Sequence, residues 1–357
     1  MHRRQFLQTL NAMGASVILP ASAFYGEGAS AITATQTPTN AVEVAGSDWA
    51  IPKVGVVALG GRGSAIVNKL AGRLPYLGLS IAIDTDVNSL QRVKADRKIL
   101  VGDGKAPSLE PQAARFLAQS SLPEIADAVA GLDMVLLVAG MGGAAGSGIA
   151  PIVAQMLREQ DILTLAFTTL PSSFGSLQRK QIAQTGIREL RLHVNALLPF
   201  SNRNIERVAG ENASFTSVSS QAALAFDQLW RGILNPVCRP GWVNIDFEDL
   251  RHIILSHEGD CAFGFGSASG VDGAAVAALH AIDHPLLGRS RLQRASTVLM
   301  AVRASPQVLK LGDSMSAMRS IRKQLSQDPW IIYGTYHDDT LDNEITVSVL
   351  ASGIRAA

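Results

Sequence analysis

The feature that most constrains the fold of this chain is a glycine-rich stretch at residues 140–148, which reads Gly-Met-Gly-Gly-Ala-Ala-Gly-Ser-Gly. An apolar run at 134–139 predicts a buried strand before it, and apolar spacing at 149–157 predicts a helix after it, with Pro151 in the first turn. Strand, glycine-rich loop and helix start together present backbone N–H groups and the positive end of a helix to an anion. Two interpretations of the loop are possible from these features alone: a phosphate-binding site, or a tight strand-to-helix connection that binds nothing.

The residue order of this loop resembles the signature of the tubulin/FtsZ family, Gly-Gly-Gly-Thr/Ala-Gly-Ser/Thr-Gly, which wraps the phosphates of GTP. The loop lacks the Gly-Lys-Ser/Thr ending of a Walker loop and the G-x-G-x-x-G order of a dinucleotide site, which disfavours a Rossmann-type oxidoreductase. The resemblance extends over residues 53–354. It implies an α/β fold with a Rossmann-like parallel-sheet GTPase domain at 49–218, a long central helix at 219–240 and a smaller α+β domain at 241–357.

The composition fits a two-domain globular protein. The 357 residues are 47% hydrophobic and 17% charged, and the net charge of +1 gives no electrostatic argument for a nucleic-acid partner. After residue 50 no stretch is long and apolar enough to span a membrane. Cys238 and Cys261 have no metal-ligand or disulfide spacing, so we expect buried thiols. We expect no metal site, because zinc-like spacing is also missing among the histidines at 252, 257, 280, 284 and 337.

The amino-terminal segment resembles a twin-arginine export signal. Two arginines precede a mildly apolar stretch and an Ala-x-Ala exit, which fits a signal at residues 1–23, and a flexible linker is expected at 24–48. A GTP-driven polymer belongs where GTP is, so we favour the cytoplasm, with export to the periplasm as the alternative. The last residue given is Ala357, so we expect the family's adaptor-binding tail to be absent. The expected partner is another copy of the chain.

A second glycine-rich segment lies between a predicted strand at 54–59 and a predicted helix at 65–74. By resemblance it is another nucleotide-contacting loop of the family, here with Ala65 at the position of the family's asparagine. Arg62 interrupts the glycine run and is either a phosphate contact or a solvated loop residue. The expected contacts of this loop are Gly60, Gly61, Arg62, Gly63 and Ser64.

Two carboxylates, Asp84 and Asp86, follow the predicted strand at 79–83. At the carboxyl end of a strand they face the ligand crevice of an open α/β sheet, where they could hold a ribose or a hydrated cation such as Mg²⁺. Alternatively, they form an Asx turn and cap the predicted helix at 87–93.

The resemblance implies further pocket residues and shows departures from the family pattern. Arg179 matches an arginine at the sugar–phosphate end of the pocket, and Asn202 matches an asparagine that hydrogen-bonds guanine. Gly175 replaces the family's glutamate at the start of the predicted helix. Ser219 and Ala223 occupy the positions that stack on the base and read its edge, so we expect weak guanine selectivity.

An acidic loop follows Arg239-Pro240-Gly241 and resembles the family's synergy loop, Asn-x-Asp-Phe-x-Asp. The resemblance implies that Asn244, Asp246 and Asp249 are catalytic, because in a filament this loop enters the pocket of the next subunit and positions the hydrolytic water. Carboxylates three residues apart at a helix start lie on one face, where they can polarise a water. The alternative is that Asp246 only caps a helix that begins near Phe247.

Apolar spacing elsewhere predicts the remaining elements. Strands are expected at 161–168, 193–198, 253–255, 296–303, 328–336 and 344–351, and helices at 123–131, 174–182, 220–234, 274–282 and 314–325. Residues 261–270 resemble a strand and turn of the family.

Two functional hypotheses follow. The first is an FtsZ-like protein of the cell-division or cytoskeletal type. It would bind GTP or GDP on the loops at 60–64 and 142–148, assemble head to tail and hydrolyse GTP weakly at the subunit interface. The phosphate contacts of the larger loop would be Gly140, Gly142, Gly143, Ala144, Ala145, Gly146, Ser147 and Gly148. The alternative is a degenerate homologue, a nucleotide-independent structural or interaction module, which the departures above and the short segment at 102–107 support.

Overall fold

The computed structural model describes residues 51–104, 110–201, 215–255, 260–326 and 329–354, without the side chains of 215–219. All described residues belong to one compact unit, Ala50–Ala357. The expected signal at 1–23 and linker at 24–48 therefore lie outside the described residues.

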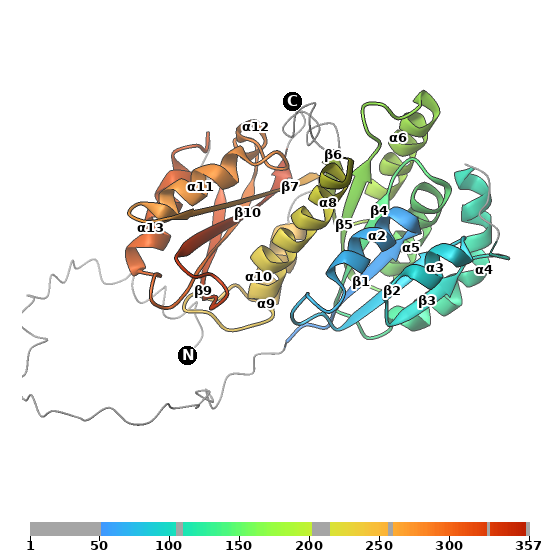
Figure 1. The fold of residues 1–357 in the computed structure, drawn as a ribbon, viewed down its shortest axis with the longest axis horizontal. Coiled ribbons are helices and arrows are strands. Elements are labelled where there is room, and N and C mark those ends of the chain that lie inside the picture. The colour runs from blue at the N-terminus through green and yellow to red at the C-terminus, as the bar shows by residue number, and fades with distance from the viewer. Residues whose placement is uncertain (1–50, 105–109, 202–214, 256–259, 327–328, 355–357) are drawn as a thin grey trace, which may run out of the picture. The chain divides into compact units, whose positions relative to one another are not determined.

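The first layer is a six-stranded parallel sheet with the order β3-β2-β1-β4-β5-β6 (Figure 1). Its central strands are buried on both faces, as continuous apolar runs require in a parallel sheet. The strand order reverses between β1 and β4, which places a ligand crevice beyond their carboxyl ends. The strands are β1 (Val54–Leu59), β2 (Leu79–Asp84), β3 (Arg97–Leu100), β4 (Met134–Gly140), β5 (Leu163–Leu170) and β6 (Ala196–Ser201).

Helices cover both faces of this sheet. Alternate residues of β4 separate the two cores, because Met134, Leu136 and Val138 join one core, whereas Val135 and Leu137 join the other. The first core contains α2 (Gly60–Leu70) and α8 (Phe215–Leu229), and the second contains α4 (Pro111–Val129), α5 (Ala150–Glu159) and α6 (Leu177–Arg191). The short helix α3 (Val87–Arg92) follows β2.

Helix α8 leads from the first sheet to the second through a π-helical turn, η3 (Trp230–Leu234), and the short helix α9 (Asn235–Val237). Trp230 is fully buried at this junction, and its indole N–H donates to the carbonyl of Pro75 at 2.8 Å. The buried indole and its satisfied N–H fix the end of the central helix against the segment before β2.

The second sheet has four strands in the order β7-β10-β8-β9, with β10 antiparallel to β7 and β8, and β9 parallel to β8. One face packs against α11 (Gly273–Asp283) and α13 (Leu311–Arg322), and the other joins the core of α8 and α10 (Phe247–Leu255). Helix α12 (Arg289–Leu292) precedes β8. The strands are β7 (Asp260–Ser269), β8 (Thr297–Ala304), β9 (Trp330–His337) and β10 (Glu344–Ile354).

Two predictions of local structure are wrong, and the start of a third element was misplaced. The expected strand at 253–255 is the last turn of α10, whose buried residues Leu250, Ile253 and Ile254 follow helical spacing. The expected loop at 60–64 is the first turn of α2. The helix expected at 123–131 belongs to α4, which begins twelve residues earlier at Pro111 and carries Pro123 inside.

Candidate functional site

A polar cleft of about 390 Å³ lies at the carboxyl ends of β1, β4 and β5. Both glycine-rich segments and the start of α6 reach it, so the structure brings together residues that are far apart in the sequence. Of the expected contact residues, those that line the cleft are Gly60, Gly61, Arg62, Gly140, Gly142, Gly143, Ala144, Ala145, Gly146 and Arg179.

Four of the expected contact residues pack beneath the cleft and do not line it. A Cβ on Gly63 would lie 2.3 Å from the carbonyl oxygen of Val138, and one on Gly148 would lie 2.2 Å from that of Pro111. Ser147 is buried, and its hydroxyl accepts a hydrogen bond from the N–H of Gly142 at 2.9 Å. Ser64 is also buried. These residues shape the cleft from below, and the remaining expected contact, Asn202, lies outside the described residues.

The larger loop runs directly into a π-helical turn, η2 (Ala145–Ile149), which continues into α5. Gly142 has a φ of +95°, a conformation that glycine adopts without strain. A Cβ on Gly146 would lie 2.0 Å from the carbonyl oxygen of Gly140, whereas one on Gly143 would meet nothing within 4 Å. The N–H groups at a helix start lack intrahelical acceptors, so this loop is an open cradle for an anion.

Two guanidinium groups and two carboxylates share the cleft. Arg62 on α2 and Arg179 on α6 are exposed side chains, and neither forms an ion pair within the described residues. Asp86 caps α3 by accepting from the N–H of Asn88 at 2.9 Å. Asp84 accepts from the N–H of Thr85 at 2.7 Å through one oxygen, and its other oxygen is buried without a partner in the described structure. The oxygen of Asp84 that bonds to Thr85 also accepts from the N–H of Asp86 at 3.3 Å, which is the expected Asx turn. The turn-and-cap interpretation is therefore confirmed for both residues, and it leaves the second oxygen of Asp84 available.

A second hollow of about 560 Å³ adjoins the cleft and shares Leu170, Pro171 and Ser172 with it. Its other lining residues come mainly from α6, with Ser201 at the end of β6. Ala223, at the position that reads the base in the family, is 5% exposed and packs in the core. The side chain of Ser219 is not among those described.

The acidic loop forms a closed hydrogen-bonded unit before α10. The side chain of Asn244 accepts from the N–H of Gly241 at 2.5 Å. Asp246 accepts from the N–H of Asp249 at 2.6 Å, and Asp249 accepts from the N–H of Asp246 at 3.2 Å. This reciprocal pattern is a capping box, so the helix-cap interpretation of Asp246 is confirmed. The cap holds the acidic loop in a fixed conformation at the amino end of α10.

The small sheet holds this loop in place. The backbone N–H of Trp242 donates to the carbonyl of Thr335 at 2.9 Å, and the backbone N–H of Thr335 donates to the carbonyl of Val243 at 2.9 Å. The loop therefore pairs with the outer edge of β9. The buried hydroxyl of Tyr336 accepts from the N–H of Ile245 at 2.7 Å. Burial raises the pKa of Tyr336, so the phenol stays protonated at neutral pH.

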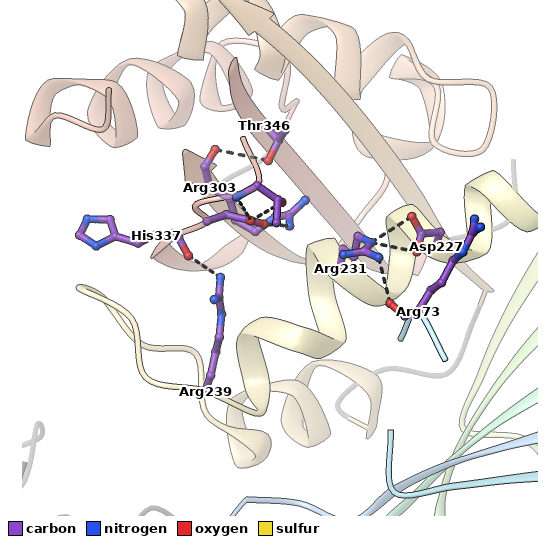
Figure 2. Close-up of polar contacts among 9 residues, drawn as sticks. Arg73, Asp227, Arg231, Arg239, Arg303, His337 and Thr346 are labelled. Atoms are coloured by element: carbon purple, nitrogen blue, oxygen red, sulfur yellow. Dashed lines mark hydrogen bonds and ion pairs between the residues drawn. The ribbon is translucent and has the colours of Figure 1, made fainter. Parts of the chain in front are cut away.

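A group of arginines near the end of the central helix bonds to the segment before β2 and to the second sheet (Figure 2). Arg231 pairs with Asp227 at 2.9 Å and donates to the carbonyl of Arg73 at 2.9 Å. Arg239 donates to the carbonyl of His337 at 2.5 Å, directly before the acidic loop. Sequence reasoning missed this group, because its members are spread along the chain.

Arg303 is the most buried member of that group, at 3% exposure, and pairs with Asp338 at 2.7 Å. Burial lowers the pKa of Arg303 to about 10, so the guanidinium remains charged at neutral pH. A buried ion pair of this kind is costly to break from one side. It therefore fixes the end of β9 against β8, close to the segment that carries the acidic loop.

The acidic loop and the cleft lie at opposite edges of the parallel sheet. Arg251 on α10 pairs with Asp161 at 3.3 Å, and Asp161 lies two residues before β5, at the amino end of that strand. The cleft instead includes Thr169 and Leu170, at the carboxyl end of the same strand. A strand of eight residues spans about 26 Å. Within one molecule, the structure therefore does not bring Asn244, Asp246 and Asp249 to the cleft.

Cys238 and Cys261 are buried thiols, as predicted. Burial raises the pKa of each to about 11, so neither is reactive at neutral pH. Among the helices of the described residues, none combines the length and the apolar character that crossing a bilayer requires.

Comparison with known proteins identifies both halves of the chain. Residues 53–210 match the model of the Tubulin/FtsZ family GTPase domain, and residues 259–355 match that of the FtsZ family C-terminal domain. The cell division protein FtsZ of Caulobacter vibrioides is 34% identical over 86% of this chain, which spans 61% of that relative's length. The cell division protein FtsZ of Pseudomonas aeruginosa is 33% identical over 84% of this chain and 77% of its own length.

Solved structures agree with these matches. An empty FtsZ dimer from M. jannaschii superposes with a TM-score of 0.78 at 26% identity, covering 85% of this chain and 89% of that one. CetZ2 from Haloferax volcanii, solved as a GTPγS-bound protofilament, has a TM-score of 0.74 at 17% identity over 85% and 94% of the two chains, and shares the fold. From its matched domains, its relatives and its fold, this chain belongs to the tubulin/FtsZ family.

Proposed function

We propose that this protein binds GTP in the glycine-lined cleft, assembles head to tail into filaments, and hydrolyses GTP where two subunits meet. Cell division protein FtsZ from Caulobacter vibrioides and Pseudomonas aeruginosa are relatives of this chain. A neighbour in fold was solved as a GTPγS-bound protofilament. The proposal extends these properties to this chain on the geometry of its own residues.

The observation that carries the proposal is the separation of the cleft from the acidic loop. The cradle lies at the carboxyl edge of the sheet, and the loop with Asp246 and Asp249 lies at the amino edge, next to Asp161. The two sites can meet only if the amino edge of one copy contacts the carboxyl edge of another. A contact between different surfaces repeats without closing and produces an open polymer.

The cleft would hold the phosphates through backbone N–H groups and positively charged side chains. The N–H groups at the start of η2 and the guanidinium groups of Arg62 and Arg179 face the same space, and they would bind the oxygens of a triphosphate. Glycine at 143 leaves room for a phosphate beside the backbone. Phosphoryl transfer to water depends mainly on such positioning and on electrostatic stabilisation.

The acidic loop would supply the water-positioning groups from the neighbouring subunit. Asp246 and Asp249 are already oriented by their reciprocal hydrogen bonds, and Asn244 is held by Gly241. A carboxylate oriented in this way can accept a proton from an attacking water. The loop therefore enters the partner's cleft without having to fold first.

A divalent cation also fits the cleft. The buried oxygen of Asp84 that has no partner in the described structure lines it, and carboxylate oxygen is the ligand type that Mg²⁺ prefers. When bound, Mg²⁺ would neutralise phosphate charge. Asp84, directly or through water, is the residue that would hold it.

Selectivity for guanine would be low. Ala223 is buried and offers no hydrogen bond to a base edge. Sites built to hydrogen-bond a ligand reject analogues by 10⁴-fold or more, whereas apolar pockets reach about 100-fold, so we propose that discrimination against ATP stays below about 100-fold. We also place the protein in the cytoplasm, where the nucleotide supply is.

The test is to measure GTP binding and phosphate release by residues 49–357 over a range of protein concentrations. We expect saturable binding, and a release rate per subunit that rises steeply with concentration because the active site needs two copies. A constant rate per subunit would contradict hydrolysis at an interface. Absence of binding at millimolar GTP would contradict the proposal and favour the nucleotide-independent scaffold.

A further inference from the structure

Arg62 carries a positive charge in the first turn of α2, where it lines the cleft. The positive end of the helix dipole makes this an unfavourable position for a cation. The first turn of α2 contains no acidic residue, and Arg62 forms no ion pair with any residue that the structure describes. A side chain that breaks a local rule without compensation inside its own chain is typical of a functional site.

The larger glycine-rich loop holds the stem of Arg62 in place. A Cβ on Gly140 would lie 2.8 Å from Cγ of Arg62, so the stem lies against the end of β4, where only glycine leaves room for it. Two residues further along the loop, a Cβ on Gly142 would lie 2.8 Å from the carbonyl oxygen of Arg179. The two arginines that line the cleft are therefore both packed closely against this loop.

The order of the strands indicates which part of a nucleotide would reach Arg62. Along the carboxyl edge of the sheet, Asp84 ends β2, Arg62 follows β1, the glycine-rich loop follows β4, and Arg179 follows β5. The hollow of about 560 Å³ adjoins the cleft on the side of β5 and β6. A nucleoside in this hollow would direct its phosphates across the loop toward β1, so the terminal phosphate would lie beside Arg62.

We propose that Arg62 is a catalytic residue, which stabilises the terminal phosphoryl group of GTP while this group is transferred to water. The inference rests on the proposed function and goes beyond phosphate binding. The acidic loop acts from the neighbouring subunit, whereas Arg62 acts from the subunit that binds the nucleotide. A guanidinium group that already faces the developing charge lowers the barrier without being reoriented during the reaction.

The step that Arg62 assists is a substitution at the terminal phosphorus. The oxygen of a water forms a bond to this phosphorus, and the bond from the phosphorus to the bridging oxygen breaks, with its electron pair staying on GDP. The water gives its proton to a carboxylate of the neighbouring acidic loop, and inorganic phosphate leaves. In the transition state, negative charge is spread over the phosphoryl oxygens, where an arginine is worth about 10³- to 10⁵-fold in rate.

Arg62→Gln in the full chain tests this role, because glutamine keeps much of the stem and removes the charge. At saturating GTP, phosphate release per subunit should fall at least about 100-fold, whereas GTP affinity should weaken less than about tenfold. The matched control is Arg73→Gln, which removes the charge of an exposed arginine that follows α2 and does not line the cleft. It should change both quantities by less than about twofold.

The outcomes separate this inference from the proposed function. Equal release rates for Arg62→Gln and Arg73→Gln, when the wild-type chain hydrolyses GTP, would overturn the inference and leave the proposed function standing. A loss of affinity as large as the loss of rate would also overturn it, because Arg62 would then only bind the ground state. Absence of GTP binding by the wild-type chain would contradict both.

Unfolding of the nucleotide-free chain shows whether the fold itself uses Arg62. Arg62→Gln should unfold within about 3 °C of the wild type, because the charge at the helix start has no partner to lose in the described structure. A midpoint lower by more than about 5 °C would overturn the assignment, since the guanidinium would then serve the fold. Arg62→Lys keeps the charge without the forked donors and should release phosphate about tenfold faster than Arg62→Gln.

Mixtures of variants show in which subunit Arg62 acts. Arg62→Gln mixed with Asp249→Asn combines intact loops with intact clefts, so release should recover to about a quarter of the wild-type rate. Arg62→Gln mixed with Gly143→Asp, which puts a carboxylate into the cradle, has no intact cleft and should not recover. No recovery in the first mixture, or recovery in the second, would overturn the placement of Arg62 in the nucleotide-binding subunit.

Discussion

The two edges of the parallel sheet are built in different ways. At the carboxyl edge, the cleft is shaped by backbone packed against backbone, with glycine where any side chain would collide, as at Gly63, Gly146 and Gly148. At the amino edge, the acidic loop is shaped by side chains that accept hydrogen bonds. Asp246 and Asp249 accept from each other's backbone N–H groups, and the hydroxyl of Tyr336 accepts from the N–H of Ile245.

This difference predicts how each edge responds to substitution. A single methyl group is enough to disturb a surface in which backbones touch. A surface held by side-chain acceptors tolerates substitutions that keep the acceptor. Such substitutions can remove a catalytic group without lowering the stability of the loop.

The largest expected effect is on the carboxyl edge. Gly146→Ala places a methyl group 2.0 Å from the carbonyl oxygen of Gly140 and should lower the free energy of unfolding by about 3 kcal/mol or more. Gly143→Ala meets open space and should change it by less than about 1 kcal/mol. Urea unfolding measures both, and similar values for the two variants would show that the cradle is not close-packed.

The next effect concerns chemistry at the amino edge. Asp249→Asn keeps an acceptor for the N–H of Asp246 but removes the negative charge, so phosphate release should fall about 100-fold while GTP affinity stays the same. Glu248→Gln makes the same change on the adjacent exposed residue and is the control. Equal rates for these two variants would remove Asp249 from the mechanism.

A smaller effect is expected from the support of the loop. Tyr336→Phe leaves the buried N–H of Ile245 without its acceptor and should cost about 2 kcal/mol in unfolding free energy. Tyr333→Phe, on an exposed residue of the same strand, should cost less than about 0.5 kcal/mol. If Tyr336→Phe were as stable as the wild type, the loop would not depend on this hydrogen bond.

The smallest effect tests a single charge in the cleft. Arg179→Ala should weaken GTP binding about tenfold, or about 1.4 kcal/mol, because one charge-assisted contact to phosphate is lost. Arg188→Ala, on the same helix but not in the cleft lining, should leave affinity unchanged. Isothermal titration calorimetry distinguishes them, and an unchanged affinity for Arg179→Ala would place its side chain outside the phosphate site.

Sequence reasoning located most strands of the parallel sheet, because strands buried on both faces are continuous apolar runs. It missed β3, where only Ile99 of four residues is buried, so no apolar run marks it. It also took residues 253–255 for a strand, since three consecutive aliphatic residues fit a strand and the last turn of a helix equally well. Leu250, Ile253 and Ile254 are buried together, which is the spacing of a helix. This burial is visible only in the folded structure.

The sequence predicted most residues of the candidate site, but it did not predict which of them line the cleft and which pack beneath it. The glycine signature indicated both loops, yet it did not distinguish Gly143, which faces the cleft, from Gly63 and Gly148, which pack beneath it. That distinction depends on how closely α2 approaches β4 at Gly63, and on how closely α4 approaches η2 at Gly148. The opposite placement of the acidic loop likewise follows from the contact of Arg251 with Asp161, which no local pattern reveals.

The most direct test of the central claim is to mix two inactive variants. Gly143→Asp puts a carboxylate into the open cradle and should prevent phosphate binding, whereas Asp249→Asn disables the loop. An equal mixture pairs intact clefts with intact loops of the other chain, so phosphate release should recover to about a quarter of the wild-type rate. A mixture no more active than the two variants measured separately would contradict an active site shared between subunits.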